Sequence, residues 1–385
     1  MKRFNSSQLS VFLLILFLIN ISVLAQRGPA PNDTLDSYQI HSDKQVTFKV
    51  YAPNANAVKL GGAELLNMVN NKEMEKTEEG IWRITVGPLK PGSYRYNFNI
   101  DGVSVIDPCN PLTSQSNMNS WSLIHVKGAD FMDKKDVPHG AISEITYYSN
   151  SLQRFRRMHV YTPPGYESGN NKYPIFYLLH GALDSDDSWS TVGRTGFIMD
   201  NLIAQNKAEP MVIVMPAGHT GPFWFGMDLN ISDFLKDFNN DIMPTVEKRY
   251  RVLNNRENRA IAGLSMGGAQ TLNIAIPNLQ KFAYVGVFSS GILGFTDEGG
   301  LDTNTESNWE EQNKQYLDND KLKKELKLIW FGIGEDDFLI KTSRATVDML
   351  ENHGFNVDYK ETTGGHTWQN WRQYLYEFSQ KLFKS

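Results

Sequence analysis

From about Gly140 to the carboxyl terminus, short apolar runs that favour β-strands alternate with stretches of helical periodicity. Residues 232–250 place apolar side chains at helical spacing, and residues 342–352 are a second helical candidate. The apolar runs are Pro174–Leu179, Met211–Met215, Arg259–Leu264, Tyr284–Phe288 and Leu326–Ile333. Alternation of this kind is typical of a mostly parallel sheet covered by helices, so it predicts an α/β domain.

The preceding part of the chain has the pattern of β-strands alone. Polar and apolar residues alternate in Gln45–Tyr51, Gly80–Val86 and Tyr94–Ile100, and turn signals such as Pro91-Gly92 separate these runs. Short strands at such spacing predict a small β-sandwich. Trp82 occupies an alternating strand position, which is more typical of a core residue than of a sugar platform.

The amino terminus has the pattern of a secretory signal peptide. Lys2 and Arg3 precede an apolar stretch from Val11 to Leu24, which the small residue Ala25 closes. We expect cleavage after Ala25 and export, so that the mature protein is secreted or periplasmic. The predicted organisation is a signal peptide at 1–25, a linker at 26–36, the sandwich at 37–128, a connecting segment at 129–139 and the α/β domain at 140–385.

The charge balance argues against nucleic acid as a partner. Lys and Arg total 38 against 43 Asp and Glu in 385 residues, which gives a net charge of −5 at pH 7. No second apolar run of membrane-spanning length follows the first, so we expect no membrane association after signal cleavage. Cys109 is the single cysteine of the sequence and allows no disulfide within the chain.

Ser265 is the candidate nucleophile. It is the centre of Gly263-Leu264-Ser265-Met266-Gly267, between the strand-like run 259–264 and a helical stretch at 268–275. A serine at such a junction, with glycine two residues away on each side, is typical of a nucleophile elbow. The alternative interpretation is a tight turn that simply needs small residues.

A serine hydroxyl needs a base, and the base needs an orienting acid. Only His353 and His366 follow Ser265, and His353 is well explained as a residue at the end of a helix before Gly354. His366 lies in the glycine-flanked loop 362–368, which is the expected place for the base. The acid is one of three consecutive carboxylates after a strand, residues 335–337, and spacing alone does not choose among them.

The oxyanion hole requires two backbone donors. One is the N–H of Met266, directly after the serine, and the other is expected from the loop after an early strand. The strand-like run 176–179 ends in His180-Gly181, which indicates the N–H of Ala182. We interpret His180 itself as a structural turn residue.

Four stretches, YLLHGALDSDDSW, AGLSMGGAQTL, WFGIGEDDFLI and TTGGHTWQNW, together resemble carbohydrate esterase family 1. This group of α/β-hydrolases includes feruloyl and acetyl-xylan esterases, and the resemblance covers the chain from about Gly140 onward. It implies Asp337 as the triad acid, with Asp336 in reserve. The leading part, VTFKVYAPNANAVKLGG through GIWRITVGPLKPGSYRYNFNIDGVSVIDPCNP, resembles the immunoglobulin-like early-set sandwich of family 48 carbohydrate-binding modules.

The resemblance implies a secreted serine carboxylesterase that acts on plant cell-wall polysaccharide. Feruloylated xylan is the first expected substrate and acetylated xylan the second, with no cofactor and no metal. Aromatic residues near the motifs are candidates for substrate binding, or equally for packing: Trp189, Trp224, Phe225 and Trp368. We also expect the segment around Trp121 to contribute to the active-site cleft.

Three other functions are compatible with the same motifs. A siderophore esterase that opens a catecholate trilactone shares the pattern, although export fits it less well. Acyl transfer to a sugar would need a cleft that excludes water. A non-catalytic glycan-binding protein would keep the fold but has no need for a complete triad, whereas all triad candidates are present here.

Overall fold

A computed structural model describes residues 31–65, 72–223, 231–293 and 308–384. The predicted signal peptide and the first residues of the predicted linker lie outside these ranges. The described chain divides into two compact units. The first unit comprises the described parts of Met1–Gly61, Asn71–Leu89 and Asn97–Pro111, and the second those of Gly62–Asn70, Lys90–Tyr96 and Leu112–Ser385. The domain boundaries at 128 and 139 stay a prediction, because the units follow packing and not chain order.

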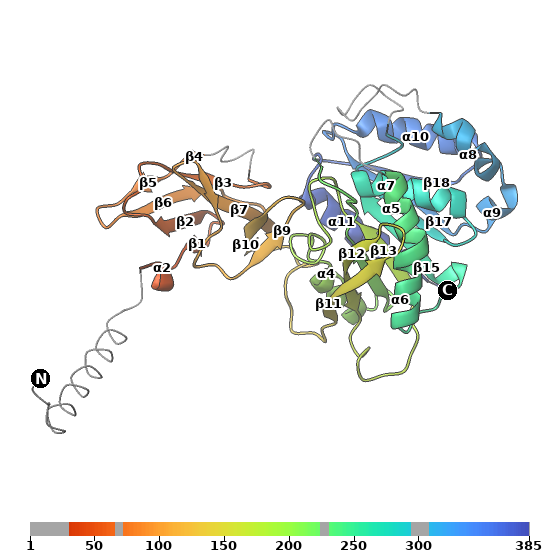
Figure 1. Cartoon of the computed structure of the whole chain (residues 1–385), viewed down its shortest axis with the longest axis horizontal. Coiled ribbons are helices and arrows are strands. Elements are labelled where there is room, and N and C mark those ends of the chain that lie inside the picture. The colour runs from red at the N-terminus through yellow and green to blue at the C-terminus, as the bar shows by residue number, and fades with distance from the viewer. Residues whose placement is uncertain (1–30, 66–71, 224–230, 294–307, 385) are drawn as a thin grey trace, which may run out of the picture. The chain divides into compact units, whose positions relative to one another are not determined.

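Apart from one four-residue helix at its start, the regular elements of the first unit's described part are β-strands (Figure 1). One sheet has the order β1-β2-β6-β5, with bounds β1 Tyr38–Ile40, β2 Val46–Tyr51, β6 Ile81–Val86 and β5 Glu75–Lys76. In the other sheet, β3 pairs with β4 on one side and with the last residues of β7 on the other. The end of β7 also pairs with β8. The bounds are β3 Val58–Gly61, β4 Lys72–Glu73, β7 Gly92–Ile100 and β8 Val103–Val105. Alternate residues of β2 are buried, as the sequence pattern predicts.

Trp82 belongs to the core of the first unit. Its side chain is 7% exposed, and its indole N–H donates to the carbonyl of Ala52 over 2.9 Å. The Nζ atom of Lys76 lies over the Trp82 ring, 5.3 Å from its centre. The interpretation of Trp82 as a core residue therefore agrees with its burial.

The predicted linker is fixed to the sandwich at its end. Residues Pro31–Thr34 form a short helix, α2. The Asn32 side chain donates to the carbonyl of Tyr51 and accepts from its N–H, at 3.1 and 3.2 Å. These two hydrogen bonds fix residues 31–34 of the predicted linker to the end of β2.

The second unit is built around an eight-stranded sheet with the order β11-β12-β14-β13-β15-β16-β17-β18. β11 and β12 form an antiparallel hairpin, β12 pairs antiparallel with β14, and all later neighbours are parallel. The bounds are β11 Ala141–Ser149, β12 Arg154–Thr162, β13 Ile175–Leu179, β14 Val212–Pro216, β15 Arg259–Leu264, β16 Tyr284–Phe288, β17 Leu328–Gly334 and β18 Val357–Thr362.

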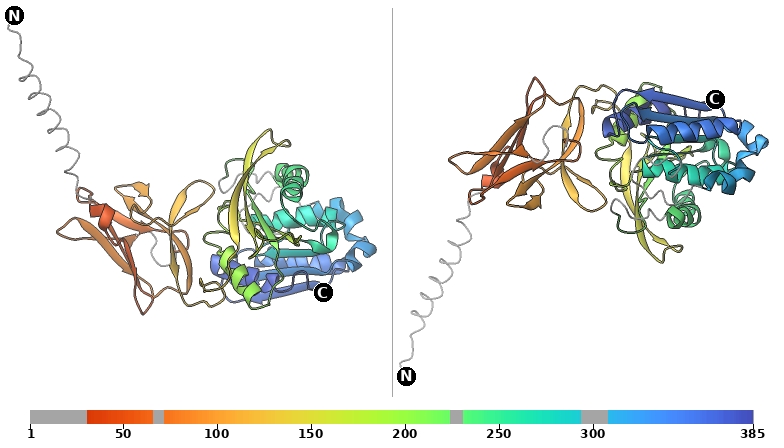
Figure 2. Two further views of the ribbon diagram at one scale, coloured as in Figure 1. Left: turned by 90° about the horizontal axis from the view of Figure 1, so that it is seen from below. Right: turned by 90° about the horizontal axis from the view of Figure 1, so that it is seen from above.

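Helices cover both faces of this sheet (Figure 2). Successive strand residues point to opposite faces, so Tyr177 packs in one apolar cluster and its neighbour Phe176 in the other. One face carries α4 Thr195–Ala204 and α11 Trp368–Ser379. The other carries α5 Ile231–Asp237, the π-helical turn η1 Phe238–Ile242, α6 Met243–Arg249, α7 Met266–Ala275, α8 Trp309–Leu317, α9 Asp320–Lys324 and α10 Ile340–Asn352. Two 3₁₀ turns, η2 Arg256–Asn258 and η3 Ile276–Asn278, complete the elements.

A second hairpin belongs to this unit. β9 (Thr113–Gln115) and β10 (Ser120–Val126) are antiparallel, and β10 pairs with the first half of β7, where Leu123 lies opposite Arg95.

The predicted fold class, an all-β domain followed by an α/β domain, is confirmed. No helix of the described ranges is long and apolar enough to span a membrane.

Candidate active site

Ser265 lies on the sharp turn between β15 and α7. Its backbone has φ 51° and ψ −120°, a conformation that residues other than glycine rarely adopt. A Cβ at Gly263 would lie 2.2 Å from the carbonyl oxygen of Gly267, and one at Gly267 would lie 2.6 Å from that of His180. Both positions therefore require glycine, and the geometry is that of a nucleophile elbow.

Ser265, His366 and Asp337 form one hydrogen-bonded row. His366 Nε2 is 3.0 Å from Ser265 Oγ, and His366 Nδ1 is 3.0 Å from each carboxylate oxygen of Asp337. A carboxylate can only accept, so Nδ1 carries the proton and Nε2 is left to accept from the serine hydroxyl. This is the arrangement in which a histidine can take a proton from serine.

The structure brings Asp337 to the histidine, and neither of its two neighbours. The Asp337 side chain is fully buried and also accepts the N–H of Leu339 over 2.9 Å, whereas Glu335 and Asp336 are exposed. All three follow β17, but only Asp337 points back under the loop that carries His366. The choice that spacing left open thus falls on the residue that the family resemblance implied.

The His366 ring is held between two aromatic side chains. Its centre lies 4.4 Å from that of Phe338 and 5.0 Å from that of Trp371, which meets it edge-on. His353, the alternative base, instead contacts Asp318 and Glu310 at the end of α10. That position agrees with its interpretation as a residue at a helix terminus.

The two predicted oxyanion donors flank Ser265. Met266 is the first residue of α7, and Ala182 follows Gly181, whose Cβ, if it had one, would lie 3.5 Å from Ser265 Cβ. Within the described residues, the N–H groups of Met266 and Ala182 donate to no backbone acceptor. They are therefore free to receive a negatively charged oxygen.

Two histidines, the buried His180 and the half-buried His219, support the loop that carries Ala182. His180 Nε2 accepts the N–H of Gly218 over 2.8 Å, so its Nδ1 carries the proton and donates to the carbonyl of Gly181, also at 2.8 Å. His219 Nε2 lies 2.6 Å from the carbonyl of Ala182. Burial lowers the pKa of each of these two histidines to about 4, which keeps both rings neutral at ordinary pH. His180 is thus a structural residue of the turn, as predicted.

A cavity of about 700 Å³ opens beside His366, and all of its walls belong to the second unit. Trp121 lines it, in agreement with the contribution expected from that segment. The lining residues come from six short segments of the chain: Ala63, Glu64, Ser93, Tyr94, Arg95, Ser116, Asn117, Met118, Asn119, Trp121, Leu183, Asp184, Phe223, His366, Thr367, Trp368, Gln369, Trp371 and Arg372.

The four aromatic residues proposed as substrate contacts differ in their positions and in their burial. Trp368 lines the cavity although it is only 2% exposed. Trp189 is fully buried, packs edge-on against Trp368 at 4.9 Å and donates its indole N–H to the carbonyl of Leu179. A side chain without exposed surface cannot stack on a ligand, so the expectation for Trp189 is corrected to packing. Trp224 and Phe225 lie outside the described residues.

Sequence reasoning missed a group of charged residues in the cavity wall. Arg95 is 5% exposed and pairs with Glu64 and Asp184 at 2.6 and 2.9 Å. Burial alone would lower the pKa of Arg95, but the two carboxylates raise it above its ordinary value. Arg372 is buried against the carbonyl of Val192, and its burial lowers its pKa to about 10. Asp184 lies in the stretch YLLHGALDSDDSW, but no motif marks Arg95, Glu64 or Arg372, because their partners are distant in sequence.

The described residues contain no group of three or more His, Cys, Asp or Glu side chains arranged to hold a metal ion.

Comparison with known proteins identifies the family of the chain. The family model described as "Putative esterase" matches residues 149–382, which is more than half of the chain. The chain belongs to this esterase family. A second model, carbohydrate-binding module 48 (isoamylase N-terminal domain), matches residues 36–117.

Individual relatives of this esterase chain carry related names. The endo-1,4-beta-xylanase/feruloyl esterase of Xylanibacter ruminicola is 31% identical over 360 residues, which are 90% of this chain and 46% of that protein. The chain thus spans about half the length of that curated relative. The solved structure of a CE1 ferulic acid esterase from Anaeromyces mucronatus is 25% identical with a TM-score of 0.55, over 67% of this chain and 96% of that one.

A third neighbour shares the fold alone. The enterobactin esterase of Shigella flexneri has a TM-score of 0.60 at 17% identity, over 89% of this chain and 94% of that one. Together, the two family models and these relatives confirm the resemblance to carbohydrate esterase family 1 and to the family 48 module.

Proposed function

We propose that the chain is a serine carboxylesterase that removes feruloyl groups from xylan side chains. The observation that carries this proposal is the row Ser265, His366 and Asp337, hydrogen-bonded throughout at 3.0 Å beside an aromatic-lined cavity. The name of the Xylanibacter ruminicola relative also includes feruloyl esterase. We propose hemicellulose, or oligosaccharides derived from it, as the partner.

The mechanism follows from the protonation states of the row. His366 Nε2 takes the proton of Ser265 Oγ, which attacks the ester carbonyl carbon, and the N–H groups of Ala182 and Met266 stabilise the oxyanion. His366 then donates that proton to the departing sugar oxygen, and an acyl-enzyme remains. Water, deprotonated by His366, attacks the acyl carbon; the C–O bond to Ser265 breaks, and the proton returns to Oγ.

The cavity favours an aryl acyl group over an acetyl group. A volume of about 700 Å³ is in the range that encloses a small organic ligand, and an acetyl group would fill only a small part of it. Trp121 and Trp371 supply aromatic surface in its wall. Met118 and Leu183, 55% and 50% exposed, add apolar surface that an aromatic ring can cover.

A substrate panel tests this proposal. The purified protein is incubated with methyl ferulate, acetylated xylan and a catecholate trilactone, and initial rates are compared with those of a Ser265→Ala variant. We expect methyl ferulate to react fastest and the variant to be inactive. Faster release of acetate or opening of the trilactone would assign the site to acetyl-xylan or siderophore esters. No turnover of any ester would favour a glycan-binding protein.

We further propose that the enzyme is exported through its amino-terminal segment. The charged Lys2-Arg3 start, the apolar stretch and Ala25 support this assignment. Amino-terminal sequencing of the protein recovered outside the cytoplasm should begin at Gln26. An intact Met1 start on protein that is retained in the cytoplasm would contradict it.

A further inference from the structure

A buried guanidinium joins two carboxylates in the wall of the cavity. Arg95 Nε and Nη2 donate to Glu64 Oε1 at 2.9 and 2.6 Å, and Arg95 Nη1 donates to Asp184 Oδ1 at 2.9 Å. The backbone N–H of Arg95 also donates to Glu64 Oε2 at 2.7 Å. The three side chains are 6%, 11% and 6% exposed for Arg95, Glu64 and Asp184.

Stability alone is a weak reason for such a cluster. The desolvation of three charged groups offsets most of their mutual attraction, and apolar replacements of buried ion pairs are often equally stable. The cluster also lies in the second unit, beside the triad, where charged groups would be retained for what they position.

Asp184 closes the turn that carries the predicted oxyanion donor. Its N–H donates to the carbonyl of Gly181 at 3.1 Å, and the same carbonyl accepts Nδ1–H of His180. That carbonyl and the N–H of Ala182 belong to one planar trans peptide group and point in opposite directions. Two donors that fix the carbonyl therefore also fix the direction of the Ala182 N–H.

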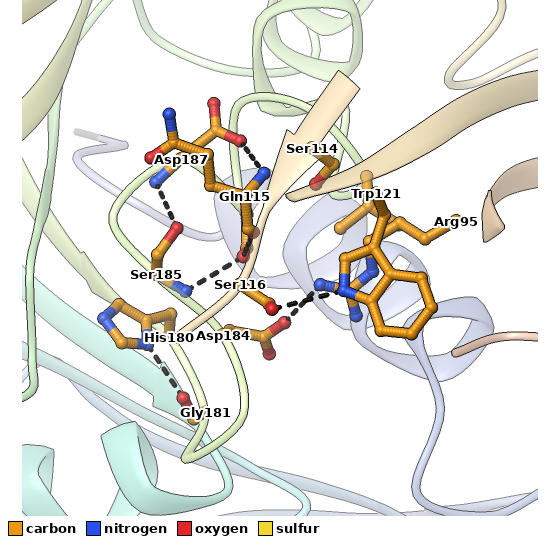
Figure 3. A network of polar contacts seen from close by, with 12 residues as sticks. Arg95, Ser114, Gln115, Ser116, Trp121, His180, Gly181, Asp184, Ser185 and Asp187 are labelled. Carbon is orange, nitrogen blue, oxygen red and sulfur yellow. Dashed lines mark hydrogen bonds and ion pairs between the residues drawn. The ribbon is translucent and has the colours of Figure 1, made fainter. Parts of the chain in front are cut away.

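Hydrogen bonds also hold the rest of the loop, residues 185–188 (Figure 3). The N–H of Gln115, on β9, donates to Asp187 at 2.6 Å, and Ser188 Oγ donates to the carbonyl of Gln115 at 3.1 Å. Ser188 Oγ in turn accepts the N–H of Ser185. At the Asp184 end of this loop, the anchor is Arg95.

We propose that Arg95 is a positioning residue for the oxyanion hole. Through Asp184 it holds the turn Gly181 to Asp184 so that the Ala182 N–H is directed at the oxygen of the tetrahedral intermediate, and Glu64 orients the guanidinium for this task. The inference rests on the proposed function, because it assigns a supporting residue to the same reaction.

The proposal gives a catalytic purpose to residues outside the matched esterase segment. Glu64, Arg95 and Gln115 all fall within the range 36–117 that matches the carbohydrate-binding module, and not within 149–382. In this chain, part of that sequence supports the reaction geometry whether or not the module binds glycan.

Three variants test the proposal: Arg95→Lys, Arg95→Met and Asp184→Asn. Lys keeps the charge but lacks the fork that reaches both carboxylates. The readouts are kcat and KM on a small aryl acetate and on methyl ferulate, affinity for an aryl boronic acid that forms a tetrahedral adduct on serine, and ferulate binding in a Ser265→Ala background. Arg259→Met is the matched control, because Arg259 is also buried and paired, with Glu247, but lies at the opposite end of β15 from Ser265.

We expect kcat to fall about 10- to 100-fold on both esters, with KM changed less than about twofold, because a misdirected donor weakens mainly the transition state. Boronate affinity should fall by a similar factor and ferulate affinity should stay unchanged. The double variant Arg95→Met/Asp184→Asn should lose no more than the worse single variant, and Arg259→Met should keep its kcat. If Arg95→Met does not fold, Arg95→Lys gives the same readouts.

The proposal is overturned if both Arg95 variants keep the wild-type kcat. It is also overturned if only the KM for methyl ferulate rises, since Arg95 would then contact substrate directly, or if the two single losses multiply in the double variant. Failure of the proposed function has a different signature, in which wild type and Ser265→Ala are equally inactive on every ester.

Discussion

At the scale of single residues, each hydrogen bond of the site decides which atom carries a proton. Asp337 can only accept, so His366 Nδ1 is protonated and Nε2 faces Ser265 as an acceptor. His180 is fixed in the same tautomer by Gly218 and Gly181. The reaction thus depends on acceptor atoms, such as the Asp337 carboxylate oxygens, that a hydrogen-bond donor could not replace.

Replacement of Asp337 by Asn should lower kcat by about 10³- to 10⁴-fold. The amide removes the negative charge that stabilises the imidazolium, and its NH₂ favours the wrong histidine tautomer. Asp336→Asn is the matched control, because Asp336 is the exposed neighbour, and it should change kcat less than about twofold. Steady-state kinetics on methyl ferulate measure both. The reverse order of the two effects would place the acid on Asp336.

How far the site could be predicted differs from residue to residue. Ser265 and His366 lie in glycine-flanked loops at the ends of predicted elements, so the sequence locates both. Arg95 lies in a strand where polar and apolar residues alternate, a pattern that normally places the polar side chains at the surface. Its burial depends on Glu64 and Asp184, which contact it from distant parts of the chain, and local patterns carry no such information.

At the scale of elements, strands made of long apolar runs were predicted well, and strands rich in polar residues were not. The runs 259–264 and 284–288 coincide with β15 and β16, because strands buried on both faces are continuously apolar. The hairpin of β11 and β12 was not predicted. β11 is mostly exposed at the edge of the sheet, and β12 begins with Arg154, the exposed Phe155 and two further arginines, so neither shows a clear apolar alternation.

The β9–β10 hairpin contributes Trp121 to the aromatic surface of the cavity. Replacement of Trp121 by Ala should raise KM for methyl ferulate about 3- to 10-fold, because an aryl group loses a stacking surface. KM for a small acetyl ester should change less than about twofold. Phe155→Ala, at the exposed start of β12, is the control and should leave both values unchanged. Equal effects of Trp121→Ala on the two esters would contradict an aryl-binding role.

At the scale of the whole molecule, the second unit includes segments that precede residue 140. Leu123 and Met132 belong to the same apolar cluster as Phe176, and Arg194 donates to the carbonyl of Met132 at 2.9 Å. A chain cut at the predicted domain boundary would therefore lose part of its own core. It would also leave the Asp184 carboxylate without Arg95.

A fragment of residues 140–385 should accordingly have a melting temperature at least about 10 °C below that of the full chain, or be insoluble. Loss of a buried Leu or Met side chain from a core costs about 2–5 kcal/mol, and about 2–4 °C corresponds to each kcal/mol in a domain of this size. Differential scanning calorimetry against a chain that begins at residue 31 measures the difference. Equal melting temperatures would show that the earlier segments are dispensable.

Stability should fall as the solution becomes acidic. Burial lowers the pKa of His125, His180 and His219 to about 4, whereas the unfolded chain protonates near 6.5. Between these values the unfolded state binds more protons, so this stabilisation is complete above about pH 6.5 and is lost toward pH 4. Each histidine contributes up to about 1.4 kcal/mol per pH unit.

Urea unfolding at pH 7, 6 and 5 measures this slope. His125→Gln is the informative variant, because His125 lies away from the oxyanion turn, and it should make the slope shallower. A free energy of unfolding that is constant or rises as the pH falls from 7 to 5 would contradict the buried neutral histidines.

The central claim, that Ser265 is the nucleophile of an ester hydrolase, has one direct test. Initial rates of ferulate release from methyl ferulate are measured for wild type and Ser265→Ala, after far-UV circular dichroism has shown that both are folded. We predict a loss of about 10⁴-fold or more, because no other group in the row can form the acyl-enzyme. A Ser265→Ala protein that hydrolyses methyl ferulate at the wild-type rate would contradict the account.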